Sequence, residues 1–399
     1  MKNKQKNSEI IKDGIKILTE GFCSQIILYG PPGTSKTYSA QKIAKSITEN
    51  NPGISKDNDK DIAIPYIQII QFHPSYNYDD FIRGITVKTI EKQIVYETQD
   101  KIFGKTAKAA AKDNKNKYVL IIDEINRAPL ASVLGELIYG LEYRKKSIFT
   151  PYEVDGTNEL KIPENLYIIG TMNTADRSIG TIDYAVRRRF AFLPVYPERE
   201  EIAGTWDGDE EPSKTGDNGL GNENGGTTEN QNTESKILEI LQEADKNDTN
   251  KIINIDKDKS TGQLTVSGKL ASIGQLAVAL FDYLIGNSDE RDKSKENGMF
   301  SSNCLEDQSI NADDIKIGHT YFMGRKKTDT GNSDNKIADQ LKFLRFRLKY
   351  QIMPVYQEYI NDGLINRSEG DKWLKRIVDI CTDISKGIEK FSGKYNEKA

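Results

Sequence analysis

A short segment rich in glycine and proline has the residue types and spacing of a loop that binds phosphate. Residues 30–37 read GPPGTSKT and follow the apolar stretch QIILY. In the pattern G-x-x-x-x-G-K-[ST], backbone N–H groups surround the phosphates and the next helix N-terminus adds a favourable partial charge. Lys36 is expected to reach the β- and γ-phosphates, and the Thr37 hydroxyl to ligate Mg²⁺. The predicted binding residues are Gly30, Pro31, Pro32, Gly33, Thr34, Ser35, Lys36, Thr37 and Tyr38.

Ser35 departs from this pattern, because it stands where the second glycine belongs. A serine at the entry of a helix can keep the right-handed helical conformation, so we expect the loop geometry to survive. The alternative interpretation of residues 30–37 is an ordinary turn before a helix.

Two adjacent acids, Asp123 and Glu124, follow the apolar stretch YVLII. Carboxylates at the C-terminal end of a parallel strand lie in the crevice where open α/β sheets bind ligands. Asp123 is expected to hold Mg²⁺, and Glu124 to polarise an attacking water. The alternative is an acidic helix start, which also favours an Asp-Glu pair.

Asn173 ends a third apolar segment, YIIGTMN. Its neutral amide can bond both the γ-phosphate and the lytic water without adding negative charge, unless it is simply a turn residue at the end of a strand.

Three consecutive arginines, Arg187, Arg188 and Arg189, precede the last strand of this region. In a ring they could point at the γ-phosphate of the neighbouring subunit as arginine fingers, which predicts poor hydrolysis by an isolated monomer. The alternative is a solvated basic helix end, which the helix dipole favours.

Short apolar strands alternate with helices around these residues, a pattern typical of a parallel three-layer α/β/α domain. The predicted strands are 25–29, 64–72, 118–122, 166–171 and 190–195, with a hairpin over 85–97 and helices over 36–47, 104–112 and 130–143.

The chain is expected to form two domains. Residues 1–24 are interpreted as an N-terminal helix and linker, and residues 25–203 as the α/β nucleotide-binding domain. Residues 204–235 have almost no large apolar side chain and are predicted to be a flexible polar insert. Residues 236–399 are predicted to be a mainly helical domain with polar inserts, containing helices over 235–245, 270–285, 337–359 and 372–391 and a possible hairpin over 252–266.

The composition excludes several classes of protein. The net charge of −4 argues against a dedicated nucleic-acid binder, although a local basic stripe remains compatible with it. Cys23, Cys304 and Cys381 lie far apart without metal-ligand spacing, which argues against a zinc site. Neither a signal peptide nor an apolar run of roughly 18 residues is present, so we expect a cytoplasmic protein without a membrane contact.

The motifs taken together resemble those of McrB-type AAA+ proteins and their dynein- and MoxR-like relatives. The resemblance covers about residues 20 to 395 apart from the inserts. It is carried by DEINRA at 123–128, QFHPSYNYDDFI at 71–82, MNTADRS at 172–178, residues 183–190, IGHTYFM at 317–323 and residues 344–354.

This resemblance implies a GTPase, with ATP as the possible alternative substrate, that needs Mg²⁺ and forms a homo-oligomeric ring, a hexamer by analogy. The family drives a McrC-like nuclease subunit against modified DNA, which it contacts through the assembled complex. By residue match, Asp176 and Arg177 would lie in the loop through which the partner organises the lytic water. Arg188 and Arg189 would be the trans-acting arginines.

The second domain resembles the family's helical lid. His319 in that region could contact the nucleotide or be a structural histidine, and Arg325 is only a candidate for a sensor arginine. His73 is best explained by packing or capping. Because fewer than 30 residues precede Gly30, recognition of a modified base is not assigned to this sequence and is expected to come from another subunit, from the nuclease partner or from a fused domain.

Two rival functions remain open at this point. One is a MoxR- or dynein-related ATPase that remodels protein partners, against which the MNTADRS and QFHPSY segments argue. The other is a nucleotide-gated assembly scaffold without hydrolysis, which Ser35 motivates.

Overall fold

The computed structural model describes residues 7–21, 23–49, 51, 66–90, 92–144, 146–176, 182–203, 205, 273–285, 298–307, 310–324 and 336–396. The chain divides into two compact units, Met1–Tyr196 and Pro197–Ala399, each of which is described by itself.

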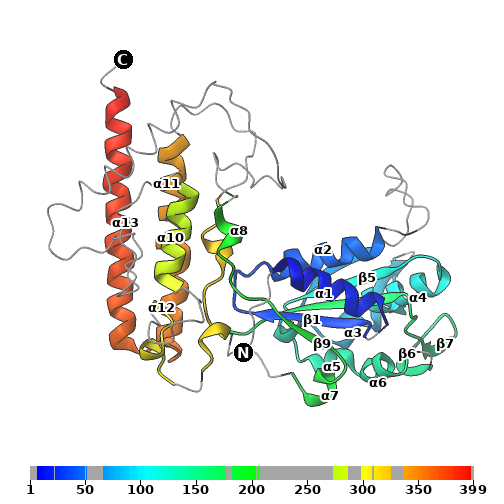
Figure 1. Ribbon diagram of the computed structural model, residues 1–399. Coiled ribbons are helices and arrows are strands. Elements are labelled where there is room, and N and C mark those ends of the chain that lie inside the picture. Colours follow the sequence, from blue (N-terminus) through cyan, green and yellow to red (C-terminus); the bar gives the residue numbers. More distant parts are fainter. Residues whose placement is uncertain are drawn as a thin grey trace. The chain divides into compact units, whose positions relative to one another are not determined.

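Five parallel strands form the sheet of the first unit in the order β2-β5-β8-β1-β9. Figure 1 shows this sheet, with β1, β5 and β9 labelled. They are β1 (Gln25–Gly30), β2 (Ile67–Gln71), β5 (Tyr118–Asp123), β8 (Leu166–Asn173) and β9 (Ala191–Pro194). Each agrees with a strand predicted from the sequence, within a few residues at the ends. Because all five run in one direction, their carboxyl ends share one edge, and Gly30 pairs there with Asn173.

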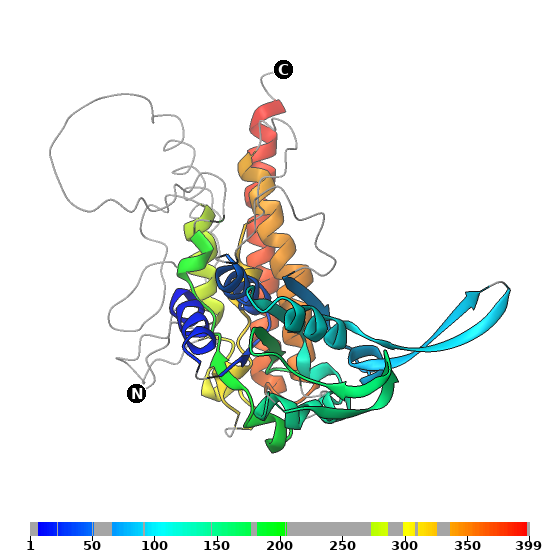
Figure 2. The same ribbon diagram turned by 90° about the vertical axis from the view of Figure 1, so that its right-hand side faces the viewer.

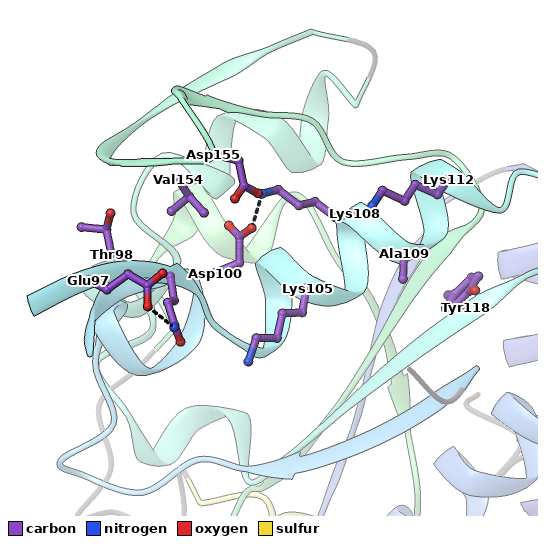
Figure 3. A pocket seen from close by; sticks show the side chains of 11 residues that line it. Glu97, Thr98, Asp100, Lys105, Lys108, Ala109, Lys112, Tyr118, Val154 and Asp155 are labelled. Atoms are coloured by element: carbon purple, nitrogen blue, oxygen red, sulfur yellow. Dashed lines mark hydrogen bonds and ion pairs between the residues drawn. The ribbon is translucent and has the colours of Figure 1, made fainter. Parts of the chain in front are cut away.

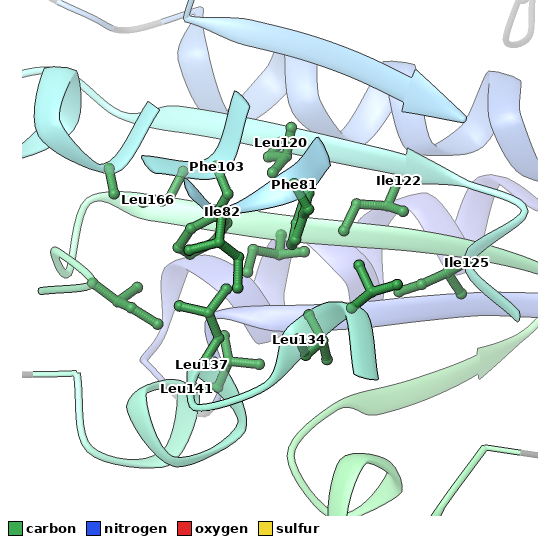
Figure 4. Packing of buried hydrophobic residues seen from close by; sticks show 14 of the residues in the cluster. Phe81, Ile82, Phe103, Leu120, Ile122, Ile125, Leu134, Leu137, Leu141 and Leu166 are labelled. Atoms are coloured by element: carbon green, nitrogen blue, oxygen red, sulfur yellow. The ribbon is translucent and has the colours of Figure 1, made fainter. Parts of the chain in front are cut away.

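Helices cover both faces of this sheet, which confirms the predicted three-layer α/β/α domain. Buried residues of α1 (Asn7–Thr19) and α2 (Lys36–Thr48) pack on one face with Val119 and Ile121. Residues from α3 (Tyr78–Phe81), α4 (Ile102–Lys112) and the segment 130–141 pack on the other face with Leu120 and Ile122 (Figure 4). Successive residues of β5 thus point to opposite sides, as an apolar strand covered on both faces requires.

The helix predicted over 130–143 is two helices, α5 (Leu130–Leu134) and α6 (Leu137–Glu142). Gly135 separates them with φ 48° and ψ −129°, a conformation that other residues avoid. A Cβ on Gly135 would also lie 3.0 Å from the Tyr78 ring. The apolar spacing of the segment continues across this break, which explains why the sequence pattern indicated one helix.

Two antiparallel hairpins extend the first unit. The predicted hairpin is β3 (Arg83–Ile90) with β4 (Gln93–Asp100), and it extends away from the sheet (Figure 2). The second, β6 (Ile148–Val154) with β7 (Thr157–Leu160), was not predicted. Its turn residues Asp155 and Gly156 have φ 53° and 79°, and an Asp-Gly pair is the sequence pattern that could have indicated it.

The second unit is helical in its described parts, as predicted. It contains α8 (Glu200–Ala203), α10 (Ile273–Ile285), α11 (Lys336–Arg347), the π-helical η5 (Leu348–Ile352), α12 (Met353–Asn361) and α13 (Arg367–Asn396), with short 3₁₀ turns η2 (Ser302–Cys304), η3 (Ala312–Asp314) and η4 (His319–Tyr321). The predicted insert over 204–235 lies outside the described residues apart from Thr205, as do the predicted helix over 235–245 and the hairpin over 252–266. No helix in the described ranges has the length and apolar character needed to cross a bilayer.

Candidate nucleotide site

The phosphate-binding loop begins where β1 ends, and glycine is required at its first position. Gly30 has φ 157°, and a Cβ there would lie 2.1 Å from the Val195 carbonyl oxygen. Gly33 has φ 75°, which also favours glycine. The buried Thr34 hydroxyl donates to the Pro31 carbonyl at 3.0 Å and closes the turn. The loop therefore leads directly from the carboxyl edge of the sheet into α2.

Ser35 does not keep the right-handed conformation expected from the sequence. Its φ of 63° and ψ of 24° are left-handed, the region that the glycine of the pattern occupies most easily. The loop geometry therefore survives with a residue in a conformation that costs an L side chain about 1–2 kcal/mol. The expectation failed because the turn into α2, and not the side chain, decides this backbone angle.

Lys36 is buried, with 7% of its surface exposed, at the start of α2. Its Nζ donates to the Gly30 carbonyl at 2.9 Å and to the Pro31 carbonyl at 2.7 Å. Burial lowers the pKa of Lys36 to about 8, while the Glu124 and Asp123 carboxylates act in the opposite direction. The ammonium group thus lies within the loop, held by neutral oxygens.

Thr37 and Asp123 come together across the ends of α2 and β5. The Thr37 hydroxyl donates to Asp123 Oδ1 at 2.7 Å, and the Thr171 hydroxyl of β8 donates to the same oxygen at 2.5 Å. A hydroxyl and a carboxylate are hard oxygen ligands of the kind that Mg²⁺ prefers, so these two predicted ligands fit the ion. Bound there, Mg²⁺ would neutralise phosphate charge between Thr37 and Asp123.

Glu124 follows β5 in a left-handed conformation, with φ 53° and ψ 45°. Its N–H donates to the Thr171 hydroxyl at 3.2 Å, and its Oε1 accepts from the Asn173 amide at 2.5 Å. Its Oε2 accepts from Arg127 Nε at 3.1 Å, and Arg127 Nη2 lies 3.5 Å from Asp176 Oδ2. The structure thus brings the predicted base Glu124, the amide of Asn173 and the carboxylate of Asp176 into one cluster at the carboxyl edge of the sheet.

The three arginines lie in and after α7 (Tyr184–Arg187), and their surroundings differ. The Arg187 guanidinium lies over the Phe192 ring, 4.8 Å from its centroid. The Arg189 side chain is only 8% exposed and contacts Glu142 at 2.7 Å, whereas Arg188 is 65% exposed and lies 3.3 Å from the same carboxylate. Of the two predicted trans-acting arginines, Arg188 is therefore the one that the first unit presents at its surface.

Two further predicted nucleotide-binding residues are Tyr38 in the first unit and His319 in the second. Tyr38 is exposed on α2, with Lys42 over its ring. His319 is buried in the second unit, where its Nδ1 accepts from the Glu198 N–H at 3.1 Å and burial lowers its pKa to about 4. This geometry agrees with a structural histidine, and its contact with a nucleotide stays a prediction. Arg177 and Arg325 lie outside the described residues.

Thr171 and Arg127 were not given a role from the sequence, yet both hold the acids of the site. Thr171 lies two residues before Asn173 on β8, so strand alternation places both on one face. A threonine two residues before Asn173 is the sequence signal for this contact. Arg127 lies three residues after Glu124 in η1 (Ile125–Arg127), a spacing that allows side chains on one helical turn to meet.

An open groove of about 630 Å³ lies elsewhere in the first unit, between β4, α4 and the β6–β7 turn (Figure 3). Lys108 crosses it and pairs with Asp100 at 2.5 Å and Asp155 at 2.8 Å. None of its lining residues belongs to the phosphate-binding loop. Because acids and lysines face one another across it, we interpret it as an ion-paired junction between the hairpins and α4. Its lining residues are Glu97, Thr98, Gln99, Asp100, Lys105, Lys108, Ala109, Lys112, Tyr118, Val154 and Asp155.

Comparisons with known proteins agree with a nucleotide-binding domain. A family model for the AAA domain (dynein-related subfamily) matches residues 25–190. The chain is 39% identical over 176 residues to the Type IV methyl-directed restriction enzyme EcoKMcrB subunit of Escherichia coli (strain K12), covering 43% of this chain and 35% of that protein. It is 29% identical over 204 residues to the Type II restriction enzyme BsuMI component YdiS of Bacillus subtilis (strain 168), covering 42% of this chain and 55% of that protein.

The chain thus spans about a third and about half of the length of these two relatives. Among solved structures, NtrX from Brucella abortus in complex with ATP is 12% identical with a TM-score of 0.32, covers 98% of this chain and 69% of that one, and is too distant to support an inference. The AAA model, in contrast, spans the same residues that build the nucleotide site. Residues 25–190 therefore form an AAA-type domain, and this chain is similar over 176 residues to the McrB subunit.

Proposed function

We propose that this chain hydrolyses a nucleoside triphosphate, GTP in preference to ATP, in a ring of identical subunits, and thereby drives a McrC-like nuclease in the restriction of modified DNA. The observation that carries the hydrolysis is the cluster of Lys36, Thr37, Asp123, Glu124 and Asn173 at one edge of the sheet. A phosphate-binding lysine, two oxygen ligands for Mg²⁺, a carboxylate for water and a neutral amide are the groups that this reaction needs.

In this proposal the side chains divide the work. The loop and Lys36 bind the phosphates, while Thr37 and Asp123 hold Mg²⁺, which stabilises the developing charge. Glu124 polarises the attacking water, and Asn173 orients it. Arg188 of a neighbouring copy supplies the cation that completes the transition-state charge.

The first test is turnover by the purified chain with GTP and with ATP, each with Mg²⁺. We expect Glu124→Gln to bind nucleotide normally and to hydrolyse it at least about 100-fold more slowly, the size of effect typical of losing a general base. An unchanged rate in Glu124→Gln would remove this chain as the hydrolase and favour the scaffold function. A clear preference for ATP would defeat the GTPase assignment but not the hydrolase.

The shared site is tested by mixing two inactive variants. Arg188→Ala lacks the cation and Lys36→Ala lacks the phosphate contact, so a mixed ring can form intact sites from one chain of each kind. We expect activity in the mixture above that of either variant alone. Arg187→Ala serves as the matched control, because Arg187 lies over Phe192. No recovery in the mixture would argue against a site shared between copies.

The names of the two restriction relatives support the nuclease partner, whereas the dynein-related description of the AAA model favours remodelling of a protein partner as the second candidate function. Stimulation of turnover by a McrC-like nuclease encoded beside this chain would separate them. A partner that raises GTP turnover and cleaves DNA supports restriction. An adjacent gene without a nuclease supports remodelling.

A further inference from the structure

The carboxylate of Glu124 has both of its oxygens engaged by its own chain. Oε1 accepts from the Asn173 amide at 2.5 Å, and Oε2 accepts from Arg127 Nε at 3.1 Å. Only 17% of the Glu124 side chain is exposed. A carboxylate that polarises water must direct an oxygen at that water, so the contact with Arg127 competes with the role proposed for Glu124.

Arg127 has a second acid within reach. Its Nη2 lies 3.5 Å from Asp176 Oδ2, so one guanidinium spans the carboxylates of Glu124 and Asp176. The Arg127 side chain is 42% exposed, and ion pairs of that exposure are weak and easily exchanged. Asp176 follows β8, whereas Glu124 and Arg127 follow β5. A small movement between these two segments would therefore shift the Arg127 guanidinium from one carboxylate to the other.

We propose that Arg127 is a latch on Glu124: paired with Glu124 it holds the site in a slow state, and transferred wholly to Asp176 it releases Glu124 to the water. This inference rests on the proposed hydrolysis and adds its regulation. Asp176 then acts through Arg127 as a positioning residue. Anything that moves the segment after Asn173 toward Arg127, including a partner subunit, would raise the rate.

The backbone supports an arrangement with two states. Glu124 is held in a left-handed conformation that a glutamate adopts at a cost, and such strain persists where surrounding contacts impose it. The Thr171 hydroxyl accepts the Glu124 N–H, which fixes the backbone while leaving the side chain to exchange partners. The neighbouring Asn126 Nδ2 donates to the Asn173 carbonyl at 3.3 Å and ties the two segments together.

The test measures steady-state turnover without any partner, in four forms of the chain: wild type, Arg127→Met, Asp176→Asn and the double variant. Methionine keeps the length of the side chain and removes the guanidinium. We expect Arg127→Met to raise kcat about threefold with KM nearly unchanged, a size consistent with loss of a half-exposed ion pair. Asp176→Asn should lower kcat, because the guanidinium then has only Glu124. The double variant should match Arg127→Met.

A kcat in Arg127→Met that is equal to or below that of the wild type would overturn the latch and make Arg127 a supporting residue. Additive effects in the double variant would disprove that Asp176 acts through Arg127. Arg127→Lys is the matched control: it keeps the charge but cannot span two acids, so its kcat should lie between the wild type and Arg127→Met. Unfolding midpoints of all variants should agree with that of the wild type.

A second readout does not need turnover. Hydrogen exchange of the peptide that contains Asn173 and Asp176 should be faster in Arg127→Met, because the bridge to the β5 side is lost. Unchanged exchange would also overturn the latch. If the wild type hydrolyses neither GTP nor ATP with any partner, the proposed function fails, whereas turnover together with a slow Arg127→Met defeats the latch alone.

Discussion

Two buried cations of the first unit, Lys36 and Arg83, differ in the groups that accept hydrogen bonds from them. Arg83 at the start of β3 has no exposed surface, and every part of its guanidinium is bonded. Its acceptors are Asp100 at 2.8 Å, Thr150 Oγ1 at 2.8 Å and the carbonyls of Tyr152, Thr157 and Glu159 at 3.2, 3.3 and 3.0 Å. Among the residues that the structure describes, the Lys36 ammonium donates to two neutral carbonyls, both in its own loop, and burial lowers the pKa of Lys36 to about 8.

The difference separates a structural charge from a functional one. A buried cation that donates to a carboxylate and to several carbonyls has its hydrogen bonds satisfied within the fold. Through these bonds Arg83 joins hairpin β3–β4 to hairpin β6–β7. A buried charge without a paired acid is stabilised further by an incoming anion. The Lys36 ammonium is therefore placed to bind phosphate. Replacing Lys36 is expected to lower the free energy of unfolding less than replacing Arg83.

The largest expected effect is on stability. Arg83→Met leaves the buried Asp100 paired with the partly exposed Lys108, and removing one partner of a buried pair costs about 3–5 kcal/mol. Urea denaturation of the purified chain measures this loss. Lys108→Met, at a partly exposed partner of the same Asp100, should cost less than about 1 kcal/mol. Equal losses of stability in both variants would show that Arg83 does not hold the two hairpins together more strongly than Lys108 does.

At Lys36 we expect a large effect on turnover and none, or a gain, in stability. Lys36→Met should lower kcat about 100- to 1000-fold, the range reported for removing one preorganised donor to a transition state. Its free energy of unfolding should stay the same or rise, because a desolvated ammonium is removed. A large loss of stability in Lys36→Met would erase the distinction between the two cations.

The lowered pKa of Lys36 gives a dependence on pH with a defined sign. In the free protein the ammonium loses its proton near pH 8, below the ordinary 10.5, and triphosphate favours the charged form. Nucleotide binding should therefore take up a proton above about pH 8 and weaken by as much as tenfold per pH unit, about 1.4 kcal/mol. Below about pH 7 this group should contribute no slope. Calorimetric titrations in two buffers of different ionisation enthalpy measure the proton uptake, and its absence would contradict the assignment.

For the unfolding of the free protein the same shift acts in the other direction. Between about pH 8 and the ordinary 10.5 the unfolded chain holds more protons at Lys36 than the folded one, so this group makes the fold more stable as pH rises. Lys36→Met should remove that contribution.

The smallest expected effect concerns Ser35. Because its φ is 63°, Ser35→Gly should relieve backbone strain and raise the free energy of unfolding by about 1 kcal/mol. Turnover should remain, because the loop already has the glycine-like conformation. Ser35→Ala, which keeps a Cβ in the left-handed region, is the matched control and should show no such gain. A loss of stability in Ser35→Gly would mean that the serine side chain holds the loop.

Much of the fold and of the chemical inventory could be predicted from the sequence. The strands β1, β5 and β8 have the continuous apolar runs that a sheet covered on both faces requires, so YVLII and YIIGTMN indicated two of them directly. The site residues follow those runs, and the parallel direction placed Asp123, Glu124 and Asn173 at one edge. The Asp-Gly pair at 155–156 is the sequence pattern of the β6–β7 turn, whereas the break at Gly135 lies within a segment whose apolar spacing is helical.

Residue types and their order along the chain were enough to determine the class of domain and the groups that meet phosphate, because strand polarity alone brings strand ends together. The partners of each charge were decided only by the tertiary structure. Arginine is usually exposed, and nothing in the sequence distinguishes Arg83 from Arg127. Arg83 is nevertheless buried with five hydrogen-bond acceptors, whereas Arg127 contacts the carboxylates of Glu124 and Asp176. The contact of Arg83 with the Glu159 carbonyl at 3.0 Å and that of Arg127 with Asp176 at 3.5 Å join segments far apart in the chain, and no local periodicity encodes them.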